Sequence, residues 1–346
     1  MRLEDFDYHL PEIHIAQHPC DTRDRSRMMI VDRTTGSIRH ETFLNLPEYF
    51  KQGDMLLIND SKVIPAKIIG QRETGGLIEI LLLSRISETA PHTSVWEAML
   101  KPSRRIRIGD RLFFNNHCEA VIDKRISDKK WQITLTAQTN LEDFLSSYGR
   151  APLPPYIKRN KALAAEDNDI ERYQTVYAKI PGSIAAPTAG LHFSHHVLSR
   201  IRAKEIQIAP ITLHVGHGTF APIETALVED HRMHEEYFEI SQNTADTINN
   251  AENVIAVGTT SVRVIESVAD ETGRVKPISS RTDLFIYPGY RFKRINALLT
   301  NFHLPKSSLF LLVCSFAGKD LIRKAYQQAI ENRYRFYSYG DCMLIL

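Results

Sequence analysis

The spacing of hydrophobic residues changes near residue 150, and this change predicts two kinds of structure along the chain. From about residue 55 to 150, short apolar or β-branched runs alternate with Gly, Asn or Asp. Such runs are typical of strands joined by turns, and a succession of them predicts a small barrel. The predicted strands are residues 55–58, 77–83, 95–100, 111–114, 119–123 and 131–136, with short helices near 45–51 and 141–148.

After residue 155 the pattern alternates between strand and helix. Ser194 and Ser307 are suitable N-caps, because a serine hydroxyl accepts hydrogen bonds from the free N–H groups of a first helical turn. Alternation of this kind predicts an α/β layer architecture. Strands are predicted at 206–215, 254–257 and 297–300, and helices at 194–204, 261–269, after Ser307 and at 319–333.

A stiff, proline-rich linker at 152–155 separates the two patterns. The first 60 residues are too few for a stable domain of their own, so we expect them to pack with the C-terminal part. The predicted fold class is therefore α/β, with a larger α/β domain formed by residues 1–60 and 154–346. The second domain is an inserted small antiparallel β-barrel formed by residues 61–153.

The composition narrows the class of protein. Hydrophobic content of 43% and charged content of 24% are ordinary for a globular protein of 346 residues. The longest apolar run, 309–316, is too short to cross a membrane, and residues 1–8 carry acids and do not form a signal peptide. The four cysteines are widely spaced without a CxxC pair, which favours a reducing cytoplasm over a disulfide framework or zinc site. We expect a cytoplasmic monomer with no membrane partner.

Positive charge is concentrated in the middle of the chain. Residues 101–130 hold nine Lys or Arg against four acids, and residues 150–161 hold four against none. A basic region on a chain that is otherwise net acidic is typical of a protein that binds a polyanion. A solvated strand face is the structural alternative.

Four polar runs stand against apolar sequence, where buried strands are expected to give way to loops, at 186–193, 212–220, 257–263 and 300–305. Ligands of α/β proteins bind where strand ends and helix N-termini converge, so four such runs predict one composite site. Gly258 and three hydroxyl residues precede a helix whose free N–H groups would bind a carboxylate or phosphate, with Arg263 as a second clamp. A capped turn between strand and helix is the alternative. The chain contains neither a P-loop motif nor a GxGxxG fingerprint.

Histidines and an amide add candidate chemistry to these runs. His214 lies beside Gly216 and Gly218, which allow close approach of a ligand, and an imidazole there suits acid/base work. A hydrogen-bonded core histidine is the alternative. The run containing Asn301, Phe302 and His303 offers an amide, a ring and an imidazole that suit a purine, although a turn before Ser307 would also explain it.

Taken together, these runs closely resemble the S-adenosylmethionine:tRNA ribosyltransferase-isomerase family of queuosine biosynthesis. The resemblance covers nearly the whole chain and includes segments 59–66, 152–157, 171–177, 286–290 and 334–341. His217 departs from the family pattern, which argues against a catalytic role for it. Tyr337 and Cys342 also depart from it and are interpreted as packing substitutions.

The resemblance implies an α/β fold with an inserted β-barrel and a pentosyltransferase activity. S-adenosylmethionine would be a consumed substrate that donates ribose, so no cofactor or metal is expected. The ribosyl group would be transferred and isomerised onto the 7-aminomethyl group of 7-aminomethyl-7-deazaguanine at the tRNA wobble position. The products would be epoxyqueuosine-tRNA, adenine and methionine.

On this reading the candidate site residues fall into three groups. His214 or His303 would act as acid/base groups. Methionine carboxylate or phosphate, adenine and the modified base would be bound by Thr188, Gly190, His192, Gly216, Gly218, Thr219, Thr259, Thr260, Ser261, Arg263, Asn301, Phe302, Glu171, Arg172 and Tyr173. The tRNA would be bound by Lys101, Arg104, Arg105, Arg107, Lys158 and Arg159, and the ring of Tyr156 in the linker would stack on the RNA.

Two rival functions remain at this point. The first is a non-catalytic tRNA-binding protein whose barrel grips the RNA. The second is a metal hydrolase built on His214, His231 and His234, although the HxxH spacing lacks the usual HExxH pattern.

Overall fold

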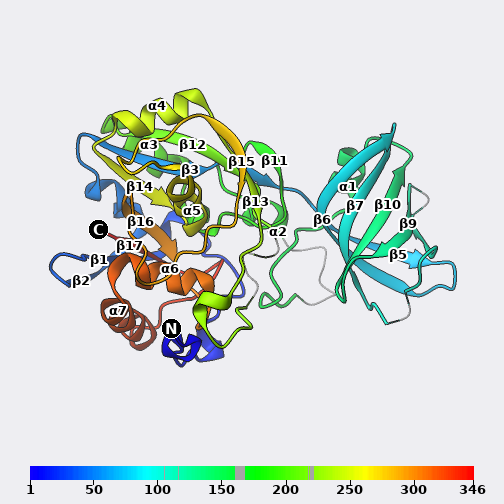
Figure 1. Ribbon diagram of the computed structural model, residues 1–346, viewed down its shortest axis with the longest axis horizontal. Coiled ribbons are helices and arrows are strands. Elements are labelled where there is room, and N and C mark those ends of the chain that lie inside the picture. Colours follow the sequence, from blue (N-terminus) through cyan, green and yellow to red (C-terminus); the bar gives the residue numbers. More distant parts are fainter. Residues whose placement is uncertain (105, 116, 160–167, 217, 219–221) are drawn as a thin grey trace.

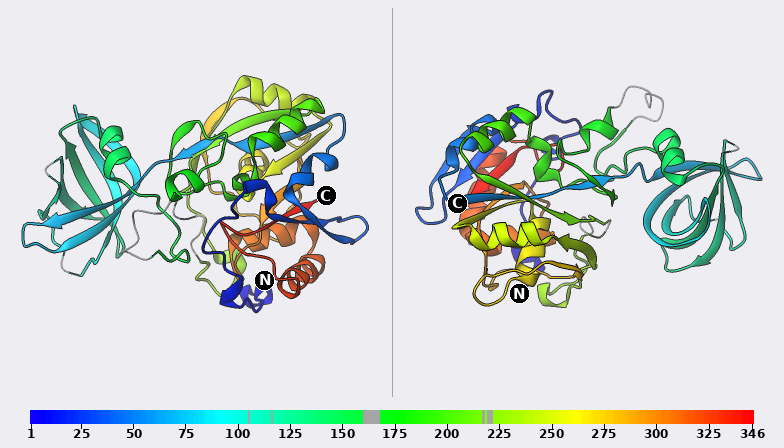
Figure 2. Two further views of the ribbon diagram at one scale, coloured as in Figure 1. Left: turned by 180° about the vertical axis from the view of Figure 1, so that it is seen from behind. Right: turned by 90° about the horizontal axis from the view of Figure 1, so that it is seen from above.

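The computed structural model describes residues 1–104, 106–115, 117–159, 168–216, 218 and 222–346. The chain forms two bodies side by side, an α/β body and a β-barrel, joined by narrow connecting segments (Figures 1 and 2). The large sheet has nine strands in the order β15-β13-β12-β3-β14-β16-β17-β1-β2. In chain order these are β1 Arg27–Val31, β2 Ile38–Thr42, β3 Asp54–Asn59, β12 Gln207–Leu213, β13 Glu236–Ile240, β14 Asn253–Val257, β15 Ile278–Thr282, β16 Ile295–Asn301 and β17 Cys342–Ile345.

The four central strands β12, β3, β14 and β16 are parallel, so their carboxyl ends meet at one edge. All six residues of β3 are buried, as expected for a strand covered on both faces. Its residues alternate between two cores, with Met55 and Leu57 in one and Leu56 and Ile58 in the other. The alternation places packed layers on both sides of the sheet.

Helices cover both faces of the sheet. Residues of α4, α5, α6 and α7 join the core on one face, and residues of α3 join the core on the other. Ser194 and Ser307 cap α3 and α6 as predicted, accepting from Val197 N and Phe310 N. The helices are α1 Leu141–Tyr148, α2 Asp169–Arg172, α3 His195–Ala203, α4 Gln242–Asn250, α5 Thr259–Val268, α6 Ser308–Ala317 and α7 Lys319–Glu331.

The second body is a closed barrel of six antiparallel strands in the order β10-β7-β6-β5-β8-β9. Inward side chains such as Ile80, Ala98 and Ile133 form a separate apolar core. The strands are β5 Lys67–Arg72, β6 Leu77–Ala90, β7 Thr93–Lys101, β8 Arg111–Phe114, β9 Cys118–Arg125 and β10 Lys130–Ala137. The predicted fold class, an α/β domain with an inserted antiparallel barrel, is confirmed; the limits 61–153 stay a prediction.

A small parallel sheet lies beside the connection. β4, Ser61–Val63, pairs with β11, Ile180–Ser183, immediately after β3 ends. An isolated bridge also pairs Lys67 with Arg150. The two chain passages into the barrel therefore pair with each other where the barrel begins.

Local predictions differ from the structure at a few places. The predicted helix near 45–51 is a 3₁₀ helix, Phe43–Tyr49, because Pro47 inside it has no N–H for an α-helical bond. The predicted helix at 261–269 begins two residues earlier, at Thr259. Strands β1, β2, β4, β5, β11, β13, β15 and β17 were not predicted.

Two further properties of the described residues concern membrane-spanning helices and cysteines. No helix among them has both the length and the apolar character needed to span a membrane. All four cysteines are free.

Candidate functional site

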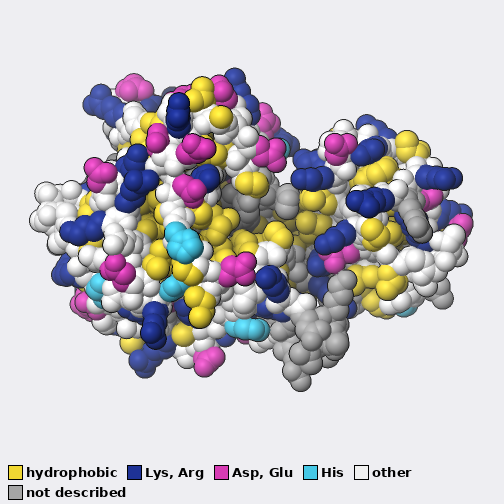
Figure 3. All heavy atoms as spheres, turned by 90° about the horizontal axis from the view of Figure 1, so that it is seen from below, with side chains coloured by type: hydrophobic (Ala, Val, Ile, Leu, Met, Phe, Trp, Pro, Cys, Tyr) yellow, Lys and Arg dark blue, Asp and Glu magenta, His cyan; other side chains and the backbone are white. Residues whose placement is uncertain are grey.

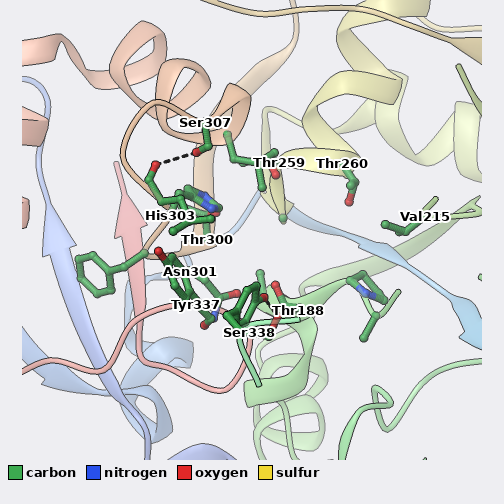
Figure 4. Close-up of a pocket in the computed structure, with 18 of the residues that line it drawn as sticks. Thr188, Val215, Thr259, Thr260, Thr300, Asn301, His303, Ser307, Tyr337 and Ser338 are labelled. Carbon is green, nitrogen blue, oxygen red and sulfur yellow. Dashed lines mark hydrogen bonds between the residues drawn. The ribbon is translucent and has the colours of Figure 1, made fainter. Parts of the chain in front are cut away.

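A cavity opens where the carboxyl ends of β14 and β16 meet the N-terminus of α5 (Figure 4). Its empty volume is about 800 Å³, counting open solvent at its mouth. Three of the four polar runs contribute segments to its wall, and the run after β12 contributes Val215. The polar runs supply residues 186–189, Val215, 258–260 and 300–305, and Tyr156, Tyr337 and Ser338 complete much of the rest.

The start of α5 forms one wall of the cavity. Gly258 has φ +89°, a conformation that glycine adopts without strain, and it turns the chain from β14 into the helix. Thr259 and Thr260 line the cavity, and their backbone N–H groups precede the first intrahelical bond, which runs from Val262 N to Gly258 O. Ser261 instead donates its hydroxyl back to Val257 O at 2.8 Å. The wall therefore presents the positive end of a helix dipole to any ligand.

Asn301 supplies a hydrogen-bond acceptor to the opposite wall. Its Nδ2 donates to Tyr337 O at 3.1 Å and to His192 Nε2 at 3.2 Å, and both partners are acceptors, which fixes the orientation of the amide. Asn301 is 2% exposed, and its Oδ1 has no hydrogen-bond partner. An orphan acceptor in a cavity wall is costly unless a ligand satisfies it.

His192 positions Asn301 from outside the cavity. Because its Nε2 accepts from Asn301, the neutral ring carries its proton on Nδ1 and donates to Ser26 Oγ at 2.7 Å. Burial, together with Arg335 and Arg23, lowers the pKa of His192 to about 3. His192 was predicted to bind substrate directly; it is not among the residues that line the cavity.

His303 lines the cavity as a neutral imidazole. Its Nε2 lies 2.8 Å from Thr300 Oγ1, its backbone N–H donates to Tyr326 Oη at 2.9 Å, and its carbonyl accepts from Tyr8. Burial lowers the pKa of His303 to about 3. The ring is therefore uncharged at neutral pH. Thr300 contacts the ring, and the two tyrosines bind the backbone N–H and carbonyl of His303.

Two buried neutral histidines predict that the protein loses stability in mild acid. Below pH 6.5 the unfolded chain binds protons at His192 and His303, whereas the folded chain does so only near pH 3. The unfolded state then binds more protons, so stability falls with falling pH, by up to about 1.4 kcal/mol per pH unit for each imidazole. Urea titrations at pH 7, 6 and 5 measure this slope.

A variant isolates the contribution of one imidazole. His192→Asn is expected to reduce the slope by up to about 1.4 kcal/mol per pH unit, and the same change at the exposed His195 is the control. Equal slopes for the parent and His192→Asn would show that His192 does not titrate as argued.

Arg263 does not reach the cavity. Its Nη1 pairs with Glu236 Oε2 at 2.6 Å, and the two side chains are 2% and 4% exposed. Its Nε donates to Leu284 O at 2.9 Å. Glu236 Oε1 also accepts from Gly216 N at 3.0 Å, so the pair joins α5, β13 and the run after β12. This geometry favours a positioning role for Arg263 over a direct clamp.

His214 lies at the end of β12, outside the residues that line the cavity. Its ring stacks on Tyr237 with centroids 5.9 Å apart, and its buried Nδ1 has no partner. Burial lowers its pKa, although Asp60 and Glu239 oppose the shift. Burial also raises the pKa of Asp60, whose Oδ1 accepts from Thr212 at 2.7 Å. The two groups form a second titratable centre at the neighbouring strand ends.

The segment 171–173 joins parts of the fold. Arg172 donates to the carbonyls of Cys20 and Asp21, and the Glu171 carbonyl accepts from Arg23 at 2.9 Å. Tyr173 is fully buried with its ring against Tyr339. None of the three lines the cavity described above.

The first run contributes both to the cavity and to packing. Thr188 lines the cavity, as Figure 4 shows. A Cβ on Gly190 would lie 2.1 Å from Tyr177 Oη, so only glycine fits at that position. Gly216 and Gly218 do not line the cavity, and a Cβ on Gly218 would meet the His234 ring at 2.3 Å. Thr219 lies outside the described residues.

The lysines and arginines predicted to bind tRNA differ in whether they form ion pairs within the protein. Lys101 is the last residue of β7, and Arg104 and Arg107 lie between β7 and β8; none of the three forms an ion pair with a described residue. Lysines and arginines are spread over the barrel face in Figure 3. Lys158 is exposed, 4.0 Å from Glu12. Arg105 lies outside the described residues.

Arg159 is held by the protein itself. It pairs with both carboxylate oxygens of Asp169 at 2.7 and 2.9 Å, and it donates to Gln17 O at 2.8 Å. A bidentate ion pair occupies the edge of the guanidinium that a phosphate would need. Its position favours an anchor for the linker over a phosphate contact.

The rival metal site receives no support from the described residues. Among them, no group of three or more His, Cys, Asp or Glu side chains is arranged to hold a metal ion. His231 instead packs edge-on against Phe285.

Sequence reasoning did not place Tyr337, Ser338 or Glu236 in or beside the site, and it assigned Tyr156 to RNA stacking and not to this cavity. Tyr337 was interpreted as a packing substitution, yet it lines the cavity. Its φ of +71° is uncommon for a non-glycine residue and marks a constrained position that the sequence does not reveal.

Comparison with known proteins gives consistent matches over the full chain. A family model described as queuosine biosynthesis protein matches residues 3–345. The S-adenosylmethionine:tRNA ribosyltransferase-isomerase of Syntrophus aciditrophicus is 58% identical over 361 aligned residues, and that of Carboxydothermus hydrogenoformans is 48% identical over 353, with full coverage of both chains in each case. A crystal structure of S-adenosylmethionine tRNA ribosyltransferase from Thermotoga maritima is 32% identical, with a TM-score of 0.55 and coverage of 99% of this chain and 100% of that one.

Proposed function

The chain belongs to the queuosine biosynthesis protein family, and from that premise we propose that it is an S-adenosylmethionine:tRNA ribosyltransferase-isomerase. It transfers and isomerises the ribosyl group of S-adenosylmethionine onto the 7-aminomethyl group of 7-aminomethyl-7-deazaguanine at the wobble position of tRNA. The products are epoxyqueuosine-tRNA, adenine and methionine. The observation that carries this proposal is one cavity that combines a helix N-terminus, a neutral imidazole and an orphan amide oxygen.

The reaction needs a proton acceptor, and His303 is the better placed of the two candidate histidines. A base removes a proton beside the sulfonium to give an ylide, adenine leaves with the help of a proton donor, the tRNA amine attacks, and methionine departs as the epoxide forms. His303 lines the cavity and is uncharged at neutral pH. His214 would act from the neighbouring strand end, beside Asp60.

The carboxylate of the methionine moiety fits the N-terminus of α5. Free N–H groups near Thr259 and Thr260 and the helix dipole favour an anion at this wall. The ion pair between Arg263 and Glu236 holds α5 against β13, away from the cavity. Asn301 lies on the opposite wall, where its free Oδ1 can accept a hydrogen bond from the adenine base. S-adenosylmethionine is consumed, so the proposal requires no resident cofactor.

The experiment that tests the function follows adenine. Purified protein incubated with S-adenosylmethionine and tRNA carrying 7-aminomethyl-7-deazaguanine is expected to release adenine, measured by chromatography. Unmodified tRNA is the matched control and is expected to release none. A non-catalytic tRNA-binding protein would bind both RNAs and release adenine with neither, and that result would overturn the proposal.

The unpaired barrel cations are expected to contact the tRNA backbone. Reversing charge in Arg104→Glu with Arg107→Glu should weaken tRNA binding and reduce the slope of log K against log salt by about one for each phosphate that the variant no longer neutralises. Binding is measured by filter retention between low and moderate salt. Arg39→Glu, on β2 at the edge of the sheet away from the barrel, reverses one charge and is the control for each single variant, Arg104→Glu and Arg107→Glu (Figure 1). An unchanged slope would move the RNA surface away from this loop.

A further inference from the structure

The cavity needs a surface for a flat ring, and Phe302 does not provide it. Phe302 is fully buried, and its ring packs against Tyr326, Tyr334 and Phe336 at centroid distances of 5.3, 5.4 and 5.0 Å. Phe302 and these three neighbours belong to one apolar core of the α/β body. Phe302 therefore shapes the wall through its backbone while its ring stabilises the fold.

Two tyrosines from distant parts of the chain provide an aromatic surface instead. Tyr156 follows the linker from the barrel, and Tyr337 precedes β17; both line the cavity. Their ring centroids are 4.7 Å apart at 44°. Tyr156 Oη lies 2.5 Å from Ser338 Oγ, which holds the first ring in place.

The backbone of Tyr337 is bound to the same strand end that carries Asn301. Tyr337 N donates to Phe302 O at 3.1 Å, and Tyr337 O accepts from Asn301 Nδ2 at 3.1 Å. These two bonds hold Tyr337 at a φ of +71°, a left-handed conformation that costs a non-glycine residue free energy and persists where its surroundings impose it. The aromatic surface and the orphan Oδ1 of Asn301 are therefore fixed relative to each other.

We propose that Tyr156 and Tyr337 form the surface on which the adenine ring of S-adenosylmethionine rests, with Asn301 Oδ1 accepting a hydrogen bond from its amino group. The inference rests on the proposed function and names the adenine subsite of that cavity. A ring flanked by an amide acceptor is the chemistry that a purine with an exocyclic amino group requires.

The 7-deazaguanine of tRNA shares that chemistry, and the rest of the cavity decides between the two bases. The N-terminus of α5 stands in the same cavity and favours a carboxylate. S-adenosylmethionine carries a purine and a carboxylate in one molecule, whereas the tRNA base carries no carboxylate. The two walls together therefore match the nucleoside substrate.

Binding of S-adenosylhomocysteine tests the subsite without turnover, because this molecule keeps the adenine, ribose and carboxylate but has no sulfonium. Calorimetry is expected to show that Tyr337→Leu and Tyr156→Leu each weaken its binding about tenfold or more, since base stacking on an aromatic ring is removed. Tyr337→Phe keeps the ring and is expected to restore most of the affinity. Tyr148→Leu makes the same change at an exposed tyrosine on α1, which does not line the cavity, and is the control. Thermal unfolding of each variant verifies that it is folded.

The outcomes separate this inference from the proposed function. Parent-like S-adenosylhomocysteine binding by folded Tyr337→Leu and Tyr156→Leu would overturn the subsite while parent adenine release still supported the function. The subsite would also be overturned if the two variants lost only binding of free 7-aminomethyl-7-deazaguanine, because the surface would then serve the tRNA base. If the parent neither binds S-adenosylhomocysteine nor releases adenine, the proposed function itself fails.

Discussion

Replacing Glu236 with glutamine is expected to lower the free energy of unfolding by about 3–5 kcal/mol, because it leaves the Arg263 charge buried without a counter-charge. The two side chains are 4% and 2% exposed and lie 2.6 Å apart. Glutamine preserves the shape and an acceptor for Gly216 N, so the loss reports on charge more than on volume. Chemical denaturation at neutral pH measures the difference.

The same strand offers a matched control. Glu239→Gln makes the identical change at an exposed position of β13 and is expected to alter stability by less than about 0.5 kcal/mol. Replacing the pair together, Glu236→Leu with Arg263→Met, is expected to recover most of the loss because no charge then stays buried. A Glu236→Gln protein as stable as Glu239→Gln would show that the pair does not hold α5 against β13.

The sequence predicts the architecture well where periodicity is strong. The alternation of strand and helix after residue 155 and the capping serines at 194 and 307 correspond to real elements because local propensity and burial agree there. The short strand β17 was missed because its pairing partners, β16 and β1, are far away in sequence. Pairing of that kind is decided by tertiary contacts, which a local pattern does not encode.

The candidate site shows the same division between local and long-range information. The runs containing Thr259 and Asn301 could be found from the sequence because small and polar residues directly follow an apolar strand in each case. The sequence could not show that Arg263 points toward Glu236, because a helix start has more than one face. Nor could it bring Tyr156 beside Tyr337, which requires the linker to fold back onto the chain before β17.

Two groups of titratable side chains lie at one edge of the sheet, one inside the cavity and one outside it. His303 is kept neutral by burial inside the cavity, while Asp60 and His214 lie at neighbouring strand ends outside it. The proposed reaction joins two substrates. The first is a nucleoside small enough to enter the cavity, and the second is a base attached to a large RNA. An enclosed imidazole suits the first substrate, and a centre outside the cavity suits the second.

His303→Gln is expected to slow adenine release about 10²–10⁴-fold, the usual contribution of a positioned acid/base group, because an amide bonds to Thr300 but does not take up a proton. S-adenosylhomocysteine binding should stay near the parent value, which separates proton transfer from binding. Since burial places the pKa of His303 near 3, its protonation should not reduce the parent rate between pH 8 and about 5. His214→Gln is the matched variant, with a smaller expected loss. If His214→Gln abolished adenine release while His303→Gln kept the parent rate, the proton acceptor would instead be the imidazole beside Asp60.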